Sequence, residues 1–160
     1  MTSAALLLSA CGDKADTAAT PETGAAVATP AADPAATTPA TAGTMMPITG
    51  ETKEVKMYGD ATGYRFDPAD ITIKAGDGIK FTFVNGGPHN VAFDPTLVPA
   101  AAKMQLMANM PEQAGELSGK MLLAEGESYT ISFAGVPAGT YDYFCTPHLA
   151  MNMKGKITIQ

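Results

Sequence analysis

Cysteine and histidine are scarce in this chain of 160 residues, which contains two of each. Cys11 and Cys145 lie in very different surroundings, so the sequence does not predict a disulfide framework. Basic residues are also few: 10 lysines and arginines stand against 16 aspartates and glutamates, which gives a formal net charge of −6. Because binding to phosphates requires a basic face, nucleic acid is excluded as a partner.

The chain also lacks a long apolar run. A membrane-spanning helix needs about 20 consecutive apolar residues, whereas the N-terminal apolar run covers residues 4–8. Leu8, Ser9 and Ala10 then precede Cys11, an ending typical of an export signal. The stretch resembles a bacterial lipoprotein signal, which implies that residues 1–11 are a signal ending at Cys11 and that this cysteine is lipidated. An Ala/Leu-rich tail is the alternative, because no lysine or arginine precedes the run.

Residues 12–50 are rich in alanine, threonine, proline and glycine. Between Gly12 and Met46 there is no aromatic residue, leucine or isoleucine, so this stretch cannot bury enough apolar surface to offset the entropy lost on ordering. We expect a disordered linker. A flexible chain of about 35 residues has a root-mean-square span of roughly 30–35 Å, which would let an attached domain search a membrane surface.

The pattern changes in residues 51–160, where short β-branched and aromatic runs alternate with turn residues. Seven or eight such strands predict an all-β fold, an antiparallel Greek-key β-sandwich with a single core. One short helix is expected over residues 99–109, because Pro99 suits a first helical turn and Pro111 would end it. The expected strands cover residues 53–58, 64–66, 70–73, 79–85, 89–93, 129–133, 139–145 and 155–159.

A thiol, an imidazole and two thioethers lie within nine residues near the C-terminus, at Cys145, His148, Met151 and Met153. Soft sulfur ligands combined with imidazole select copper or zinc, and a His2Cys plane with a weak axial methionine is typical of blue-copper electron-transfer centres. The second histidine of such a plane must be His89, because the chain has no other. Tetrahedral zinc remains an alternative for the same donors.

Two separated motifs resemble the plastocyanin-type cupredoxins, with the closest match to plastocyanin and pseudoazurin. The first runs from Pro88 to Val91, and the second places His148, Met153 and Gly155 after Cys145 at the spacing of that family. The resemblance covers residues 51–160. It implies a cupredoxin-like sandwich with one copper held by His89, Cys145, His148 and Met153.

The axial position has two candidates, since either thioether is chemically suitable. The spacing of the plastocyanin motif favours Met153, whereas the shorter spacing of amicyanins would select Met151, which otherwise packs against the core or the copper-facing surface. The resemblance also implies that the backbone amide of Asn90 donates to the Cys145 sulfur and that its side chain joins the two ligand loops. Pro147 removes a backbone donor near the same sulfur.

The resemblance further implies that His148 is exposed and is ringed by an apolar docking patch for a redox protein. That patch would consist of Gly87, Pro88, Pro147, Leu149 and Ala150. Phe144 stands where plant plastocyanins carry a tyrosine that serves as a second electron entry, and paired acidic docking runs are missing. We therefore expect electrons to enter and leave at His148.

The sequence thus predicts a monomeric blue-copper carrier that moves one electron between extracytoplasmic donor and acceptor proteins. We expect it on the periplasmic side of a bacterial membrane, and we do not expect it to be an enzyme. Copper oxidases and copper nitrite reductases need further histidines for a second centre. A copper storage or delivery protein is the alternative, because Met104, Met107 and Met110 follow one another at helical spacing. Those methionines would otherwise pack onto the sandwich.

Overall fold

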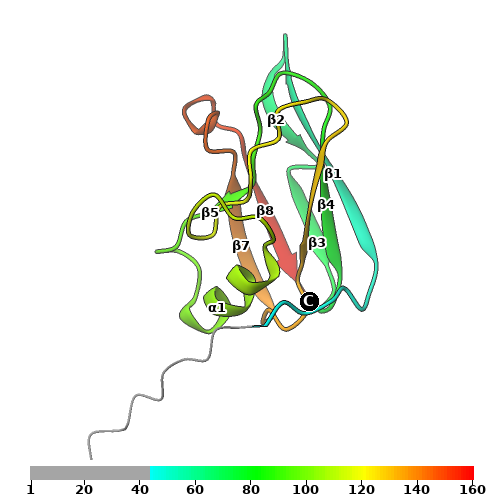
Figure 1. Ribbon diagram of the computed structural model, residues 1–160, viewed down its shortest axis with the longest axis vertical. Helices are drawn as coiled ribbons and strands as arrows, with labels where there is room; N and C mark the ends of the chain where they lie inside the picture. Colours follow the sequence, from blue (N-terminus) through cyan, green and yellow to red (C-terminus); the bar gives the residue numbers. More distant parts are fainter. Residues whose placement is uncertain (1–43) are drawn as a thin grey trace, which may run out of the picture. The chain divides into compact units, whose positions relative to one another are not determined.

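The computed structural model describes residues 44–160. The predicted signal over residues 1–11, including Cys11, and the predicted linker up to residue 43 lie outside the described residues. The described part contains eight strands and one α-helix (Figure 1). The strands are β1 (Thr52–Asp60), β2 (Gly63–Asp67), β3 (Asp70–Ile73), β4 (Gly78–Phe83), β5 (Ala92–Phe93), β6 (Ser128–Ser132), β7 (Gly139–Phe144) and β8 (Lys154–Ile159).

These strands form two four-stranded sheets, ordered β2-β1-β4-β6 and β3-β8-β7-β5. Successive strands cross repeatedly from one sheet to the other, and the expected cupredoxin-like sandwich is confirmed. The expectation of a wholly antiparallel sandwich is wrong, because β1 pairs with β4 and β3 pairs with β8 in parallel. Alternation of apolar and polar residues has the same period of two in either direction, so the pattern identifies strands without giving their relative direction.

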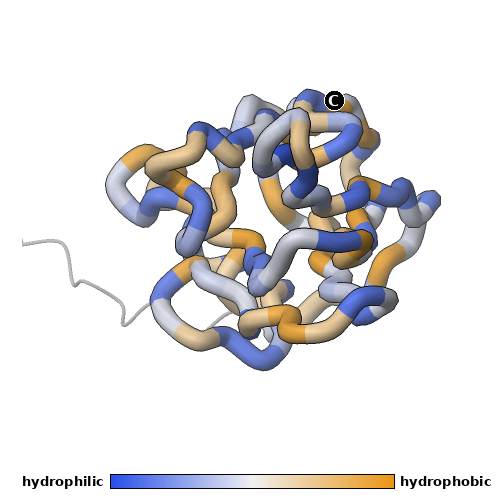
Figure 2. The backbone as a smooth tube through the Cα atoms, turned by 90° about the horizontal axis from the view of Figure 1, so that it is seen from above, coloured by the Kyte–Doolittle hydropathy of each residue, from blue (hydrophilic) through white to orange (hydrophobic). Residues whose placement is uncertain are grey.

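The core lies between the sheets and is built from the inward positions of each strand. In β1, Val55 and Met57 are fully buried while Lys56 between them is exposed. Figure 2 shows hydrophobic and hydrophilic stretches interleaved along the backbone. Tyr143 of β7 and Phe81 of β4 meet edge to face across the core, with ring centroids 5.5 Å apart. Aromatic pairs of this kind contribute about 0.5–1.5 kcal/mol beyond the area they bury.

The helix α1 (Ala100–Asn109) occupies the predicted position. Its residue Leu106 and the following Met110 are buried, and Met107 packs partly against the core. Met104 departs from the expected packing, because its side chain is exposed. Among residues 44–160 no helix combines the length and the apolar character needed to cross a membrane.

The segment 44–50 was expected to belong to the linker, and the structure instead attaches it to the folded domain. The backbone N–H of Met46 donates to the buried Asn109 side chain at 2.9 Å. The backbone N–H groups of Thr49 and Gly50 both donate to the carbonyl of Gly76, at 2.9 and 3.0 Å. Specific hydrogen bonds therefore hold a segment whose composition alone shows little preference for order.

Asp77, in the turn before β4, also holds the chain next to segment 44–50 through hydrogen bonds. Its carboxylate accepts the backbone N–H of Glu51 at 2.8 Å and that of Lys74 at 2.9 Å. The hydrogen bond from Lys74, followed by that from Glu51, holds the pKa of Asp77 below its ordinary value. The ionised carboxylate is therefore the form that the fold stabilises.

Candidate metal centre

One short loop carries three of the four predicted ligands. Cys145 follows the last residue of β7, His148 precedes a single 3-10 turn (Leu149–Met151), and Met153 precedes β8. The backbone closes this loop, because Cys145 N–H donates to the Met153 carbonyl at 3.1 Å and Met153 N–H donates to the His148 carbonyl at 3.2 Å. The three side chains therefore start from a fixed frame.

His89 reaches the same place from the connection between β4 and β5. The sequence suggested that it opens a strand, but β5 begins only at Ala92. His89 instead makes an isolated bridge with Leu122: each backbone N–H donates to the other's carbonyl, at 3.1 and 2.7 Å. Leu122 was not among the residues singled out from the sequence, since an isolated bridge leaves no period-two pattern.

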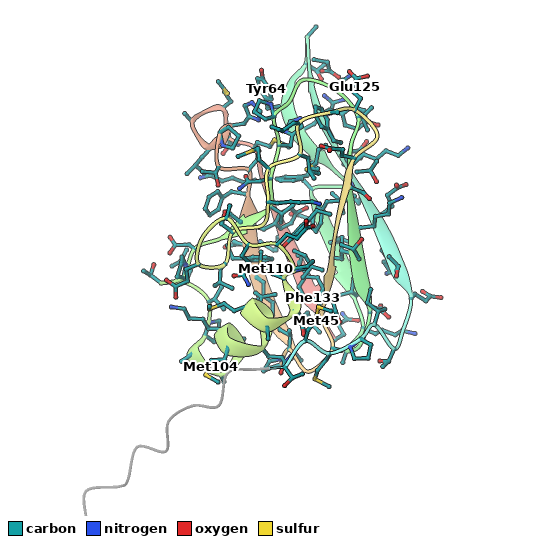
Figure 3. All side chains as sticks on the ribbon, in the orientation of Figure 1. Met45, Tyr64, Met104, Met110, Glu125 and Phe133 are labelled. Atoms are coloured by element: carbon teal, nitrogen blue, oxygen red, sulfur yellow. The ribbon has the colours of Figure 1, made fainter. Side chains whose placement is uncertain are left out.

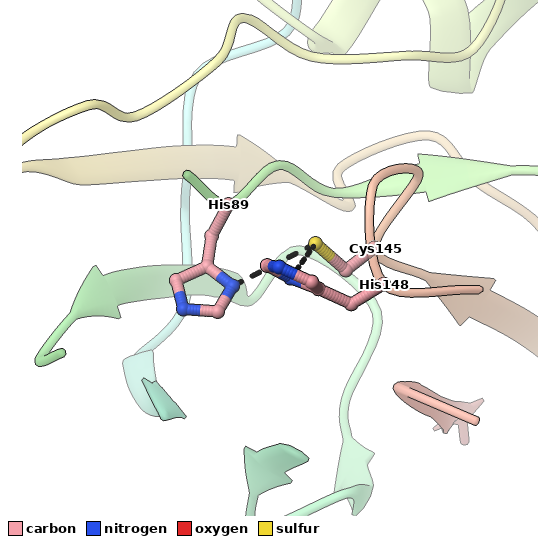
Figure 4. A group of neighbouring side chains, drawn as sticks. All are labelled: His89, Cys145 and His148. Carbon is pink, nitrogen blue, oxygen red and sulfur yellow. Dashed lines mark hydrogen bonds between the residues drawn. The ribbon is translucent and has the colours of Figure 1, made fainter. Parts of the chain in front are cut away.

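The two imidazoles and the thiol converge on one point (Figure 4). Nδ1 of His89 lies 3.7 Å from Sγ of Cys145, and Nδ1 of His148 lies 3.5 Å from it. The three donor atoms all lie within 4.8 Å of one another, and all three residues are buried. Metal bonds of about 2.0–2.3 Å to nitrogen and sulfur would place such atoms at about this separation. The donor set therefore fits one copper ion.

Hydrogen bonding fixes which nitrogen of His89 is available. Nε2 of His89 lies 2.9 Å from the Asn85 carbonyl, to which it can only donate. The Nδ1 atom consequently keeps a free lone pair directed at the site. Donation from the second ring nitrogen to a carbonyl is the usual way in which proteins orient a metal-binding histidine.

The two candidate axial methionines differ in burial. Met153 is fully buried and belongs to the core cluster that also contains Cys145, whereas Met151 is 55% exposed. Met151 therefore does not pack against the core, which was one of the two positions expected for it. Gly155, the next motif residue, lies flat against the Ala69 carbonyl and the Tyr143 ring, where an added Cβ would overlap both.

Asn90 links the two ligand loops in the way that the resemblance implied. Its backbone N–H lies 3.5 Å from Sγ of Cys145. Its side chain accepts the backbone N–H of Thr146 at 2.7 Å and donates to the Thr146 hydroxyl at 3.1 Å and the Ser118 hydroxyl at 3.2 Å. Thr146 and Ser118 were not identified from the sequence. Pro147 is exposed beside them and has no N–H to donate.

Burial favours the uncharged forms of all three donors. It raises the pKa of the Cys145 thiol, although hydrogen bonds from the backbone of Asn90 and His148 act in the opposite direction. It lowers the pKa of His89, and it lowers that of His148 together with the nearby His89. Neutral imidazoles are ready to bind a metal, whereas the thiol must lose its proton when a metal binds.

The surface around the site agrees only in part with the expected patch. Gly87, Pro88, Leu149 and Ala150 are exposed, as is Pro147. His148 is not: only 5% of its surface is accessible. The ring of Tyr64 in β2 lies on the imidazole, with centroids 3.7 Å apart and planes inclined by 18°. No pattern in the sequence indicates this contact, because Tyr64 is remote from both ligand motifs along the chain.

Comparison with known proteins agrees with this geometry. Residues 53–160 match the family described as copper binding proteins, plastocyanin/azurin family. The chain is 37% identical over 121 residues to the chloroplastic plastocyanin of Tetradesmus obliquus, covering 76% of each chain. It is 39% identical over 106 residues to the plastocyanin of Scenedesmus fuscus, covering 66% of this chain and 97% of that one.

A solved structure gives the same result. The oxidised plastocyanin of Dryopteris crassirhizoma superposes with a TM-score of 0.51 at 32% identity, covering 67% of this chain and 99% of that one. The family match runs from the second residue of β1 to the end of β8 and includes every residue of the converging donor set. The chain therefore belongs to the plastocyanin/azurin family of copper-binding proteins.

Proposed function

We propose that this protein is a mononuclear blue-copper carrier that moves single electrons between redox proteins outside the cytoplasm. The observation that carries the proposal is the buried group of His89, Cys145 and His148, with two Nδ1 atoms directed at one Sγ. When bound, copper supplies a one-electron couple between Cu(II) and Cu(I). Met153, buried beside this group, is the proposed axial ligand.

The way in which the donors are held supports electron transfer. His89 is fixed by the Asn85 carbonyl and by its bridge with Leu122. The Cys145 loop is closed by backbone hydrogen bonds at both ends. Groups held in this way move little when the charge of a bound ion changes, and a small structural change permits rapid electron exchange.

Two observations favour a carrier over an enzyme. The chain has only two histidines, and both belong to this site, so a second copper centre built on histidine has no ligands. The donors are also buried, with the Cys145 and His89 side chains fully inaccessible to solvent. A substrate would have no direct access to the ion, whereas an electron can cross a thin layer of protein.

Copper storage or delivery is the competing function, and the reason to consider it was the helical spacing of Met104, Met107 and Met110. Met110 is buried and Met107 packs against the core. These two thioethers are explained by packing, so they give little support to a copper-handling array. Release of Cu(I) to an acceptor protein is the measurement that separates the two functions.

The proposed location is the periplasmic side of a bacterial membrane, with Cys11 as the lipidated residue. Support comes from the sequence of residues 1–11 and from the linker that separates them from the domain. The proposed docking patch consists of Gly87, Pro88, Pro147, Leu149 and Ala150 at the site's end of the sandwich. Small apolar contacts of this kind suit brief encounters between redox proteins.

Absorption spectroscopy of the purified, Cu(II)-loaded protein tests the proposal. Wild type is expected to show the intense visible band of a thiolate-copper bond, and Cys145→Ser, His89→Ala and His148→Ala are expected to lose it. Met151→Leu is the matched control and should retain the band, since its side chain is mostly exposed. Voltammetry should give a reversible one-electron wave. A colourless wild type, or rapid loss of Cu(I) to an apo acceptor, would contradict the proposal.

A further inference from the structure

The two histidines of the site are held by different means. His89 is oriented by a hydrogen bond from Nε2 to the Asn85 carbonyl, and the ring of Phe83 meets it edge on at 4.9 Å. In the described part of the chain no hydrogen bond reaches Nε2 of His148. No buried side-chain nitrogen or oxygen in that part lacks a partner, so Nε2 of His148 must keep some contact with solvent. The orientation of His148 therefore needs another source.

Stacking against the Tyr64 ring orients His148, as the hydrogen bond to the Asn85 carbonyl orients His89. The two rings lie nearly parallel at 3.7 Å, which is the distance of optimal contact between carbon atoms. A ring in that position blocks rotation of the imidazole out of its plane. It also covers one face of His148, which accounts for an exposure of only 5% in a residue at the end of the sandwich.

The backbone places Tyr64 for this contact. Tyr64 lies opposite Gly59 in the antiparallel pairing of β1 and β2. An added Cβ at Gly59 would lie within 2.5–2.7 Å of two carbon atoms of the Tyr64 ring, so the ring occupies the space that a side chain at position 59 would fill. Figure 3 shows Tyr64 at the end of the sandwich opposite Met104 and Met45. Gly59 on one side and His148 on the other thus confine the tyrosine.

We propose that Tyr64 is a positioning residue for the copper site: it holds the His148 imidazole in its ligating orientation and covers its face. This inference rests on the proposed function, since it assigns a partner to one of the proposed ligands. The phenol hydroxyl has no part in it, because the contact is made by the ring. A redox protein that docks at this end meets the Tyr64 ring together with the Nε2 edge of His148.

The rate at which an excess of a Cu(I) chelator removes copper tests this assignment. Tyr64→Leu removes the ring and is expected to increase the rate about tenfold, while Tyr64→Phe keeps the ring and should stay within twofold of wild type. A tenfold change corresponds to about 1.4 kcal/mol, which is within the range of an aromatic pair. Tyr58→Leu is the matched control. Tyr58 lies in β1 with Arg65 over its ring at 4.5 Å, away from the ligands.

A second variant disturbs the stack while keeping the tyrosine. Gly59→Ala would place a Cβ against the Tyr64 ring and 2.7 Å from the Gly86 carbonyl oxygen, and it is expected to accelerate copper removal as well. This variant keeps the proposal testable if Tyr64→Leu fails to fold. Rates for Tyr64→Leu and Gly59→Ala within twofold of Tyr58→Leu would overturn the proposal, as would a Tyr64→Phe rate equal to that of Tyr64→Leu.

Proton NMR of the metal-free protein gives a readout that is independent of copper. The ring protons of His148 should lie upfield in wild type and in Tyr64→Phe because of the ring current of residue 64, and this shift should be lost in Tyr64→Leu. Absence of the upfield shift in wild type would refute the stack itself. A wild type with the NMR shift but without a blue copper band would instead refute the proposed function.

Discussion

Asn90→Ala should show whether the Asn90 side chain supports copper binding directly or only through the stability of the fold. The Asn90 side chain is 2% exposed and makes three hydrogen bonds, two to Thr146 and one to Ser118. Asn109 offers a matched control at the other end of the molecule. It is 1% exposed and also makes three hydrogen bonds with its side chain, to Met46, Gln105 and Ala134.

The expected loss of stability is similar for both variants. A hydrogen bond contributes about 1 kcal/mol net, so the loss of three should lower the free energy of unfolding by about 3 kcal/mol in each case. This is a substantial part of the 5–15 kcal/mol typical of a domain, and both variants should still fold. With a urea m-value of about 1–3 kcal/mol/M, the midpoint should fall by about 1–3 M.

Urea unfolding of the metal-free proteins, followed by far-UV circular dichroism, measures the free energy of unfolding without a contribution from copper binding. The copper site should then distinguish the variants. Asn90→Ala frees the Cys145 loop from the His89 loop, and losing a residue that supports metal ligands typically costs about 10–100-fold in affinity. Asn109→Ala should leave copper affinity and the visible spectrum unchanged, because Asn109 contacts no ligand.

Two results would refute this reasoning. If both variants lost the same affinity for copper, Asn90 would act on the site only through general stability. If Asn90→Ala lowered the free energy of unfolding by less than about 1 kcal/mol, its three hydrogen bonds would be replaced by water at little cost. The backbone N–H of Asn90 towards Sγ is retained in the variant, so that contact is not tested.

Three further predictions concern other parts of the domain. Met153→Leu should keep the fold, since it conserves volume in the core, but shift the visible spectrum of the Cu(II) protein, whereas Met151→Leu should leave the spectrum unchanged. Gly155→Ala should lower the free energy of unfolding by about 1–3 kcal/mol through overpacking, while Gly115→Ala, where an added Cβ meets only one atom at 3.8 Å, should be nearly neutral in a thermal melt. Asp77→Asn should be less stable than wild type at pH 7. The folded pKa of Asp77 is depressed from 3.8, so the carboxylate's contribution to stability is complete above that value and is lost as the pH falls through the folded pKa. Urea titrations of the metal-free proteins should therefore show the difference in stability between the two proteins shrinking below about pH 4.

Most of the fold and the donor set could be predicted from the sequence because their signals are local. Alternating apolar and polar residues indicate strands, and Cys145, His148 and Met153 lie within nine residues. His89 lies far from these residues in the chain, and it could be found because the chain has no third histidine and because residues 88–91 match a family motif. Where a family motif fixed the expectation, as for the Asn90 hydrogen bonds, the structure contains the expected contacts.

The remaining features depend on contacts between distant segments. The parallel pairing of β1 with β4 results from how the chain crosses between sheets, which no local pattern records. Tyr64 lies 84 positions before His148 in the chain, and a tyrosine in a strand is ordinarily a core or surface residue. The attachment of residues 44–50 likewise depends on single hydrogen-bond acceptors, such as Asn109, that lie elsewhere in the sequence.

The anchoring of this segment also fixes the end of the domain at which residue 44 lies. Met46 is held by Asn109, and Ile48 lies against Gly78 at the start of β4, whereas Phe83 at the end of that strand contacts His89. At about 3.3 Å per residue, β4 separates the two ends by roughly 15–20 Å. Residues 46–48 therefore lie at the end of β4 that is remote from the donor set. A protein that docks at the donor set could therefore do so without displacing residues 44–50.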